Sequence, residues 1–220
     1  MEQNRLDFDA LVLAGGRSSR LGGVPKQGLV FEGVPLLQHS LAACSAASLT
    51  AVVGPDPGPL PARVVACREQ PEFAGPAAAV AAGLEALAQA GGGRHFTLVL
   101  ACDMPRVAGA VRVLAEFLDS PGYTGDGVMA CSEDGRAQML VGFYRTDGLK
   151  SAVTELASRD GLIDASMRSL LASLDLQLVT VPAGTTADVD TWDDAAALGV
   201  DAEAGRAPGP ARQHELGGEE

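Results

Sequence analysis

The sequence predicts an α/β fold built on a mostly parallel β-sheet. Short apolar runs typical of buried strands alternate along the chain with alanine-rich stretches of helical length. Strands that are separated by helices form βαβ units, and the strands of such units run parallel. A turn signal at residues 133–136 joins two apolar runs as a hairpin, so we expect the sheet to have a mixed edge.

The expected elements follow one another in a regular order. The strands are residues 9–13, 50–53, 62–66, 95–101, 128–131, 137–144 and 176–181, with a short extended piece and turn at 29–35. The helices are residues 35–46, 76–90, 107–118, 147–157 and 162–173, with a short one after Thr191. We therefore predict one domain over residues 1–200. Residues 201–220 lack apolar periodicity, so we expect a disordered tail there.

Composition and charge exclude several classes of protein. The chain of 220 residues has a net charge of −12 and no basic stripe that would bind nucleic acid. It begins without a signal-peptide pattern, and no apolar run reaches membrane-spanning length, so we expect a cytoplasmic protein without membrane contact. Its four cysteines are widely spaced and its three histidines are scattered, so neither set predicts a metal site or a catalytic triad.

A glycine-rich loop follows the first strand and is the strongest functional signal in the chain. Residues 14–26 read Ala-Gly-Gly-x-x-x-Arg-x-Gly-Gly-x-x-Lys. Glycines let backbone N–H groups approach a ligand closely, and the positive charges of Arg17, Arg20 and Lys26 can balance the charge of an anionic ligand. Lys26 is one of two lysines among 16 cationic residues, which indicates a need for a compact ammonium beside phosphate oxygens. The two common phosphate motifs are absent, because the lysine follows a proline and the first two glycines are adjacent.

Carboxylates follow two other strands, at the edge of the sheet where ligands bind in such folds. Asp103 comes directly after the strand at 95–101. Mg²⁺ prefers one or two carboxylates together with phosphate oxygens, so beside the phosphate loop we favour metal binding over helix capping for Asp103. Asp190 follows the last strand, and it is either a second metal ligand or the N-cap of the short helix that begins near Trp192.

The loop motif resembles the signature of nucleotidyltransferases of the sugar-nucleotide and molybdopterin type. Further matching segments are residues 73–84, 101–105, 138–145, 166–174 and 188–194. Together they resemble molybdenum cofactor guanylyltransferases over nearly all of residues 9–198. This resemblance implies a Rossmann-like, three-layer αβα fold of the nucleotide-diphospho-sugar transferase type. It also implies transfer of GMP from GTP to molybdopterin cofactor, with Mg²⁺ as cofactor and pyrophosphate as the second product.

The same resemblance implies roles for individual residues. The nucleotide-binding residues would be Leu13, Ala14, Gly15, Gly16, Lys26, Gly54, Arg68, Gly75 and Asp103. Arg20, Lys26 and Asp103 would act in catalysis, and Asp103 with Asp190 would hold the metal. We also expect a monomer that makes transient contacts with cofactor-synthesis or acceptor enzymes.

Two positions depart from the guanylyltransferase pattern. Pro25 precedes the lysine where that family has aspartate, which is more similar to the cytidylyltransferases of isoprenoid synthesis. Asp190 stands where the guanylyltransferases carry asparagine. A cytidylyltransferase that acts on molybdopterin or on a sugar or alditol phosphate therefore stays open. A non-catalytic nucleotide-sensing protein of the same fold is the alternative from another class, although the intact Lys26 and Asp103 favour an enzyme.

Overall fold

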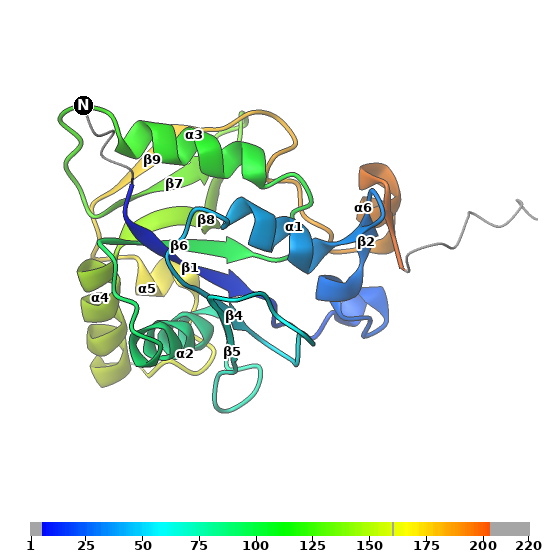
Figure 1. The fold of residues 1–220 in the computed structure, drawn as a ribbon, viewed down its shortest axis with the longest axis horizontal. Coiled ribbons are helices and arrows are strands. Elements are labelled where there is room, and N and C mark those ends of the chain that lie inside the picture. The colour runs from blue at the N-terminus through cyan, green and yellow to red at the C-terminus, as the bar shows by residue number, and fades with distance from the viewer. Residues whose placement is uncertain (1–5, 160, 203–220) are drawn as a thin grey trace, which may run out of the picture.

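A seven-stranded sheet forms the centre of the molecule (Figure 1). The structure, a computed structural model, describes residues 6–159 and 161–202. The strands of the sheet run in the order β5-β4-β1-β6-β8-β7-β9. They are β1 (Phe8–Leu13), β4 (Thr50–Val53), β5 (Val64–Cys67), β6 (Phe96–Ala101), β7 (Gly127–Cys131), β8 (Ala137–Arg145) and β9 (Leu176–Thr180).

The sheet is mostly parallel and mixed, as the sequence predicts. The pairs β1–β4, β1–β6, β4–β5 and β7–β9 are parallel, whereas β8 runs antiparallel to both of its neighbours. The reversed strand lies inside the sheet, between β6 and β7, and not at its edge. The carboxyl-terminal half of β8 suits an interior strand, because Val141, Phe143 and Tyr144 are buried there and both faces of the sheet are packed against helices.

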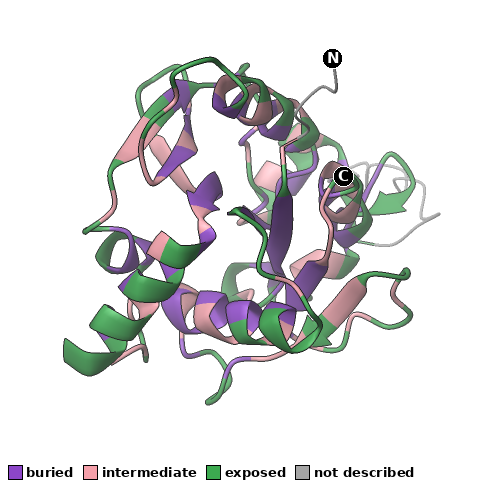
Figure 2. Ribbon diagram, turned by 60° about the vertical axis from the view of Figure 1, so that its left-hand side comes forward, coloured by how far each residue is buried: buried purple, intermediate pink, exposed green. Residues whose placement is uncertain are grey.

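Helices cover both faces of the sheet, which confirms the three-layer fold. One face packs against α1 (Leu36–Ala43) and α3 (Ala108–Leu118). The other face packs against α2 (Pro76–Gln89), α4 (Thr146–Arg159) and α5 (Met167–Leu170), as Figure 1 shows. Buried residues concentrate along the central strands and on the inward sides of these helices (Figure 2). None of the described helices has both the length and the apolar character needed to cross a membrane.

A buried carboxylate pins the amino end of β1. Asp9 is almost completely buried within an otherwise apolar strand. Its oxygens accept hydrogen bonds from the backbone N–H groups of Leu49, Gly93 and Arg94, at 3.1, 2.7 and 3.0 Å. Because a buried charge is tolerated only when its hydrogen bonds are made, Asp9 joins the loops before β4 and β6 to β1 and so fixes the order of the three central strands.

A small second sheet lies beside the carboxyl end of the main one. It consists of β10 (Val200–Asp201), β2 (Val30–Phe31) and β3 (Val34–Pro35), all antiparallel, and it packs with α6 (Trp192–Leu198). The sequence predicts the extended piece and the short helix but misses β10. Asp201 therefore belongs to the folded part and not to the predicted tail, whose residues 203–220 lie outside the described residues.

The helix predicted over residues 162–173 is wrong over most of its length. Only Met167–Leu170 is helical, and Asp164 has a φ of +58°. The segment before the helix instead bonds to the loop ahead of α2, because the N–H of Asp164 donates to the carbonyl of Ala74 and the N–H of Ala77 donates to that of Ala165. These tertiary hydrogen bonds override the local helical pattern.

Candidate active site

A pocket of ≈ 470 Å³ opens at the carboxyl ends of β1 and β6. It lies between the glycine-rich loop after β1, the loop ahead of α2 and the loop after β6. The predicted site residues that line it are Leu13, Gly15, Gly16, Arg20, Lys26, Gly75, Asp103 and Asp190. The topology thus brings together residues that lie as far apart in the chain as 13 and 190, as expected for ligand sites in open α/β sheets.

The glycine-rich loop folds around two short 3₁₀ turns that carry its cations. Ser19–Leu21 forms the first turn and presents Arg20, and Lys26–Gly28 forms the second and presents Lys26. Gly22 and Gly23 join the turns at φ values of +68° and +84°, a region that strongly favours glycine. The reversal they make brings both cations to the pocket.

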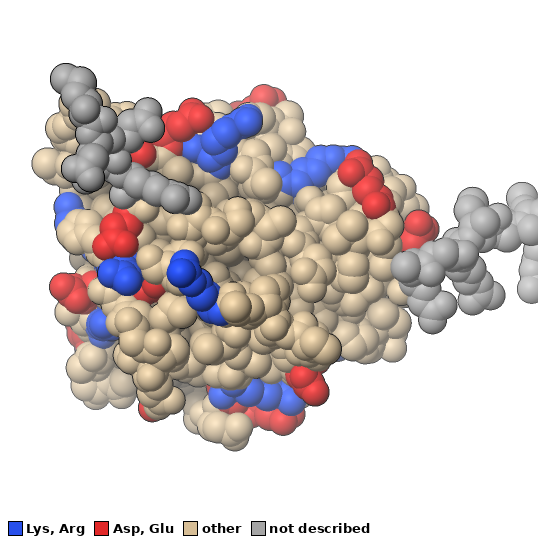
Figure 3. Space-filling view, viewed as in Figure 1, with Lys and Arg blue, Asp and Glu red and all other residues tan. Residues whose placement is uncertain are grey.

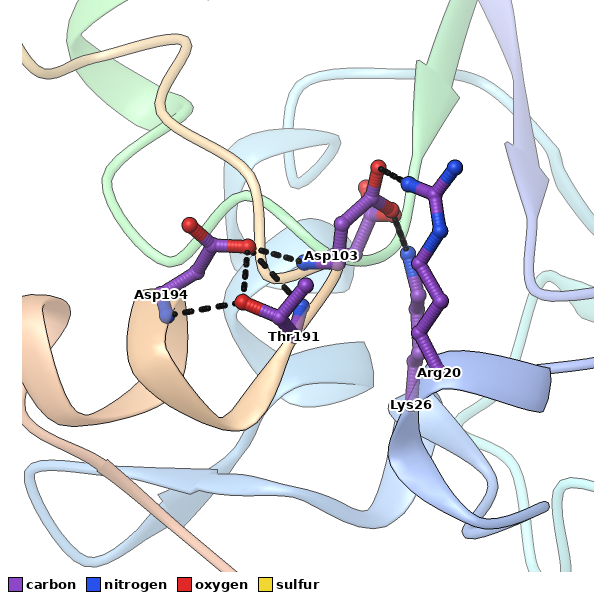
Figure 4. A network of polar contacts seen from close by, with 6 residues as sticks. Arg20, Lys26, Asp103, Thr191 and Asp194 are labelled. Atoms are coloured by element: carbon purple, nitrogen blue, oxygen red, sulfur yellow. Dashed lines mark hydrogen bonds and ion pairs between the residues drawn. The ribbon is translucent and has the colours of Figure 1, made fainter.

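Lys26 forms the centre of a charge cluster in the pocket (Figure 4). Its ammonium nitrogen lies 2.8 Å from Oδ2 of Asp103 and 2.5 Å from Oδ1 of Asp190. The guanidinium of Arg20 lies 3.6 Å from the other oxygen of Asp190. The Lys26 and Asp103 side chains are only 19% and 16% exposed, whereas Arg20 is 72% exposed and faces solvent at the rim.

Two ionisable groups in the cluster have shifted pKa values. Burial of Lys26 acts to lower its pKa, but the charges and hydrogen bonds of Asp103 and Asp190 outweigh burial and raise the pKa above its ordinary value. The pKa of Asp188 is also raised, by desolvation and by the negative charges of Asp103 and Asp190. The site therefore holds an excess of negative charge, which Lys26 partly balances.

The same carboxylates form an arrangement that suits a divalent cation. Oxygens of Asp103, Asp188 and Asp190 all lie within 4.8 Å of one another. Oδ1 of Asp103 is buried and has no hydrogen-bond partner among the described residues. Hard cations such as Mg²⁺ take oxygen ligands of this kind, and an unpartnered buried carboxylate oxygen is costly without one, so the donor set fits such an ion.

The structure excludes the capping alternative for Asp190. Thr191 is the N-cap of α6, since its hydroxyl accepts a hydrogen bond from the N–H of Asp194 at 3.1 Å. Asp194 completes the capping box by accepting from the N–H of Thr191 at 2.8 Å. The Asp190 carboxylate is therefore not the cap, and it faces Lys26. Asp103 is likewise no cap, because the helix that follows it, α3, has no side-chain cap.

Three predicted residues do not line the pocket. The Ala14 side chain is buried in the core on the α1–α3 side. Gly54 packs behind the glycine-rich loop, where an added Cβ would lie 2.8 Å from the carbonyl carbon of Ala14 and 2.8 Å from the nitrogen of Gly15. Arg68 forms an ion pair with Glu72 at 2.9 Å and lies outside the pocket wall.

Sequence reasoning missed Glu69 and Phe73, both of which line the pocket. Glu69 is 6% exposed, and its Oε1 accepts a hydrogen bond from the N–H of Phe73 at 3.0 Å. Its Oε2 is buried without a partner among the described residues. The Phe73 ring is partly exposed and lies under the guanidinium groups of Arg17 and Arg68, at 5.7 and 5.5 Å. The available signals were an acidic residue and a rare aromatic ring in the loop before α2.

The cysteines and the described histidines take no part in this site's charge cluster. All four cysteines are free thiols, and three of them are buried. Cys102 adjoins Asp103, but burial raises the pKa of its thiol, so it stays protonated at neutral pH. His39 and His95 contact Phe31 and Arg145, away from the pocket, and His214 lies outside the described residues. On the face shown in Figure 3, basic side chains are scattered among acidic ones and form no stripe over the described residues.

The mostly parallel α/β sheet, the glycine-rich loop with its lysine, and the carboxylates at neighbouring strand ends define a nucleotidyltransferase. The chain belongs to the MobA-like NTP transferase domain family, whose model matches residues 10–178. It is 32% identical over 181 residues to a probable molybdenum cofactor guanylyltransferase from Mycobacterium marinum, covering 79% of this chain and 82% of that one. It is 35% identical over 111 residues to a molybdenum cofactor guanylyltransferase from Ralstonia nicotianae, covering 46% and 49% of the two chains.

Solved structures share the fold of this chain. Molybdopterin-guanine dinucleotide biosynthesis protein A from Archaeoglobus fulgidus has a TM-score of 0.63 at 17% identity, over 86% of this chain and 96% of that one. 2-C-methyl-D-erythritol 4-phosphate cytidylyltransferase from Francisella tularensis has a TM-score of 0.67 at 13% identity, over 88% and 98% of the two chains. At these identities the likeness is one of fold.

Proposed function

We propose that this enzyme transfers GMP from GTP to molybdopterin cofactor in a Mg²⁺-dependent reaction and releases pyrophosphate. The observation that carries the proposal is the cluster of Lys26, Asp103 and Asp190 beside the glycine-rich loop. It offers cations for a triphosphate and oxygens for a metal within one pocket. The two guanylyltransferases described above, to which this chain is similar, support the choice of nucleotide and acceptor.

The triphosphate binds along the glycine-rich loop in this proposal. Backbone N–H groups near Gly15 and Gly16 and the ammonium of Lys26 contact its phosphate oxygens, and Arg20 adds charge from the rim. Leu13 and Gly75 form adjoining walls of the pocket. The cations stabilise the pyrophosphate as its charge grows, and stabilisation of developing charge is the largest contribution to catalysis in most such sites.

Asp103 and Asp190, with Asp188 beside them, would hold Mg²⁺. When bound, the ion supplies positive charge that neutralises phosphate oxygens. The attacking group is the terminal phosphate of the acceptor, which is already ionised at neutral pH. The reaction therefore needs no general base, and the protein's own task is to bring two anions together in line.

Glu69 supports guanine as the base. Its Oε2 is buried without a partner among the described residues and, as a carboxylate oxygen, accepts hydrogen bonds only, whereas guanine presents two adjacent donors, N1–H and the N2 amino group. On the corresponding Watson–Crick edge, cytosine and adenine each carry one amino donor next to a ring-nitrogen acceptor, and that acceptor would face the carboxylate. Phe73 and the guanidinium of Arg68 above its ring form a neighbouring surface on which a base can stack. Gly54 acts from behind, by letting the glycine-rich loop lie close to the end of β4.

Cytidylyl transfer is the second candidate. It is favoured by Pro25 before the lysine and Gln27 after it, which resemble the cytidylyltransferases of isoprenoid synthesis. A nucleotide-sensing protein without activity is the candidate from another class. Contacts with cofactor-synthesis or acceptor enzymes would be transient in any of these proposals.

Pyrophosphate release tests the proposal. The full-length protein with Mg²⁺ is given GTP, CTP or ATP separately, each with and without molybdopterin cofactor, and Asp103→Ala is the matched inactive control. We expect release with GTP only when the cofactor is present. Release with CTP in place of GTP would support the second candidate, and no release with any nucleotide would support the sensor.

A further inference from the structure

The ammonium of Lys26 contacts two of the three carboxylates that could hold a cation. It lies 2.8 Å from Oδ2 of Asp103 and 2.5 Å from Oδ1 of Asp190, and one oxygen each of Asp103, Asp188 and Asp190 lie within 4.8 Å of one another. An ammonium and a metal ion would compete for these oxygens. We propose that Lys26 is the internal counter-cation of the metal site. A divalent ion then binds tightly only together with a nucleotide, whose phosphates bind the ammonium in place of the carboxylates.

The residue type and its surroundings suit such an exchange. A lysine ammonium is a point charge on a flexible four-carbon stem, so it can turn from carboxylates to phosphates without a change of the backbone. Lys26 is only 19% exposed, and its pocket also contains the glycine-rich loop where the triphosphate binds in the proposed function. Arg20 is mostly exposed and touches only one of the carboxylates, so it does not fill the same position.

The exchange couples metal and nucleotide binding. Without nucleotide, an incoming divalent ion has to displace Lys26 and then lie beside its positive charge. With nucleotide, the phosphates both take up the ammonium and add ligands to the ion. Coupling of this kind is reciprocal, so the metal strengthens nucleotide binding by the same factor. This inference rests on the proposed function for the identity of the nucleotide but not for the metal site itself.

A metal titration without nucleotide tests the inference directly. Mn²⁺ is titrated into the full-length protein, into Lys26→Met and into Lys150→Met, and binding is measured by calorimetry and by the fluorescence of Trp192. Trp192 is the single tryptophan and lies two residues after Asp190. Lys150, the other lysine, lies on α4 and is the matched control. Far-UV circular dichroism verifies folding, and Lys26→Gln replaces the methionine variant if that one does not fold.

We expect Lys26→Met to bind Mn²⁺ alone about tenfold more tightly, or more, than the unaltered protein, because a positive charge beside the ion has been removed. Lys150→Met should bind like the unaltered protein. Equal or weaker Mn²⁺ binding by Lys26→Met would overturn the inference, since a lysine that contacts only phosphate has no effect before nucleotide is present. Absence of Mn²⁺ binding by every variant would overturn it as well.

A second titration separates this inference from the proposed function. In the presence of a non-hydrolysable GTP analogue, Mn²⁺ binding to the unaltered protein should tighten by more than it does for Lys26→Met. Equal tightening in both proteins would contradict the exchange. If the unaltered protein transfers no GMP but Lys26→Met still binds Mn²⁺ more tightly, the proposed reaction is refuted and the role of Lys26 as counter-cation stands.

Discussion

Gly54→Ala is the sharpest structural test of how the glycine-rich loop is supported. A Cβ at this position would lie 2.8 Å from two backbone atoms, the carbonyl carbon of Ala14 and the nitrogen of Gly15. Backbone cannot swing aside as a side chain can, so reaching an ordinary contact of 3.4 Å moves the loop by about 0.6 Å. A displacement of 1 Å at a reacting centre costs roughly 100-fold in rate, so we expect kcat/KM to fall about tenfold.

Gly58→Ala is the matched control for this substitution. Gly58 lies in the same loop at a φ of +73°, and an added Cβ there would meet no heavy atom within 4 Å. Gly58→Ala should lose roughly 1 kcal/mol of stability because it places alanine where glycine is favoured, and Gly54→Ala should lose more because its backbone clash adds to the same penalty. Thermal denaturation measures that loss, and steady-state pyrophosphate release measures kcat/KM. The reasoning is refuted if Gly54→Ala and Gly58→Ala have the same kcat/KM.

Three further substitutions test the charge cluster and the base end of the pocket. Asp103→Asn should abolish turnover with an unchanged far-UV circular dichroism spectrum, and near-normal turnover would contradict its role. Glu69→Gln should reduce the ratio of kcat/KM for GTP over CTP by about tenfold or more, whereas Glu85→Gln on the exposed side of α2 should leave the ratio unchanged. Because the pKa of Asp188 is raised in the folded protein, the unfolded chain releases this proton first as pH rises, and the folded state loses stability over that interval. Asp188→Asn should therefore raise the melting temperature of the metal-free protein at pH 7, and the gain should vanish as pH falls through the interval; a gain independent of pH would contradict this.

Much of the fold is predictable because local pattern and tertiary structure agree there. β1 and β6 are mostly apolar runs, as expected of strands covered on both faces. The glycine-rich loop follows the carboxyl end of β1, and Asp103 follows that of β6. The side of the sheet on which these signals meet then follows from parallel topology. Lys26 and Asp103 were expected at the same edge for that reason, and they lie 2.8 Å apart; Asp190, for which the sequence left helix capping open, joins them.

The parts that sequence reasoning missed depend on contacts between distant segments. β10 has two residues and exists because Val200 pairs with Phe31, a partner that no local pattern identifies. The segment before α5 gives up helical structure for hydrogen bonds to the loop ahead of α2. Glu69 looks in the sequence like an ordinary loop carboxylate, and only its burial without a partner for Oε2 distinguishes it.

Competition between nucleotides tests the central claim most directly. The full-length protein is incubated with Mg²⁺, molybdopterin cofactor and equal concentrations of GTP and CTP, and the dinucleotide products are identified by mass. We predict a guanine dinucleotide in at least about tenfold excess, the discrimination expected from the carboxylate of Glu69, with one pyrophosphate released per product. A product that is mainly the cytosine dinucleotide, or no dinucleotide at all, would contradict the account.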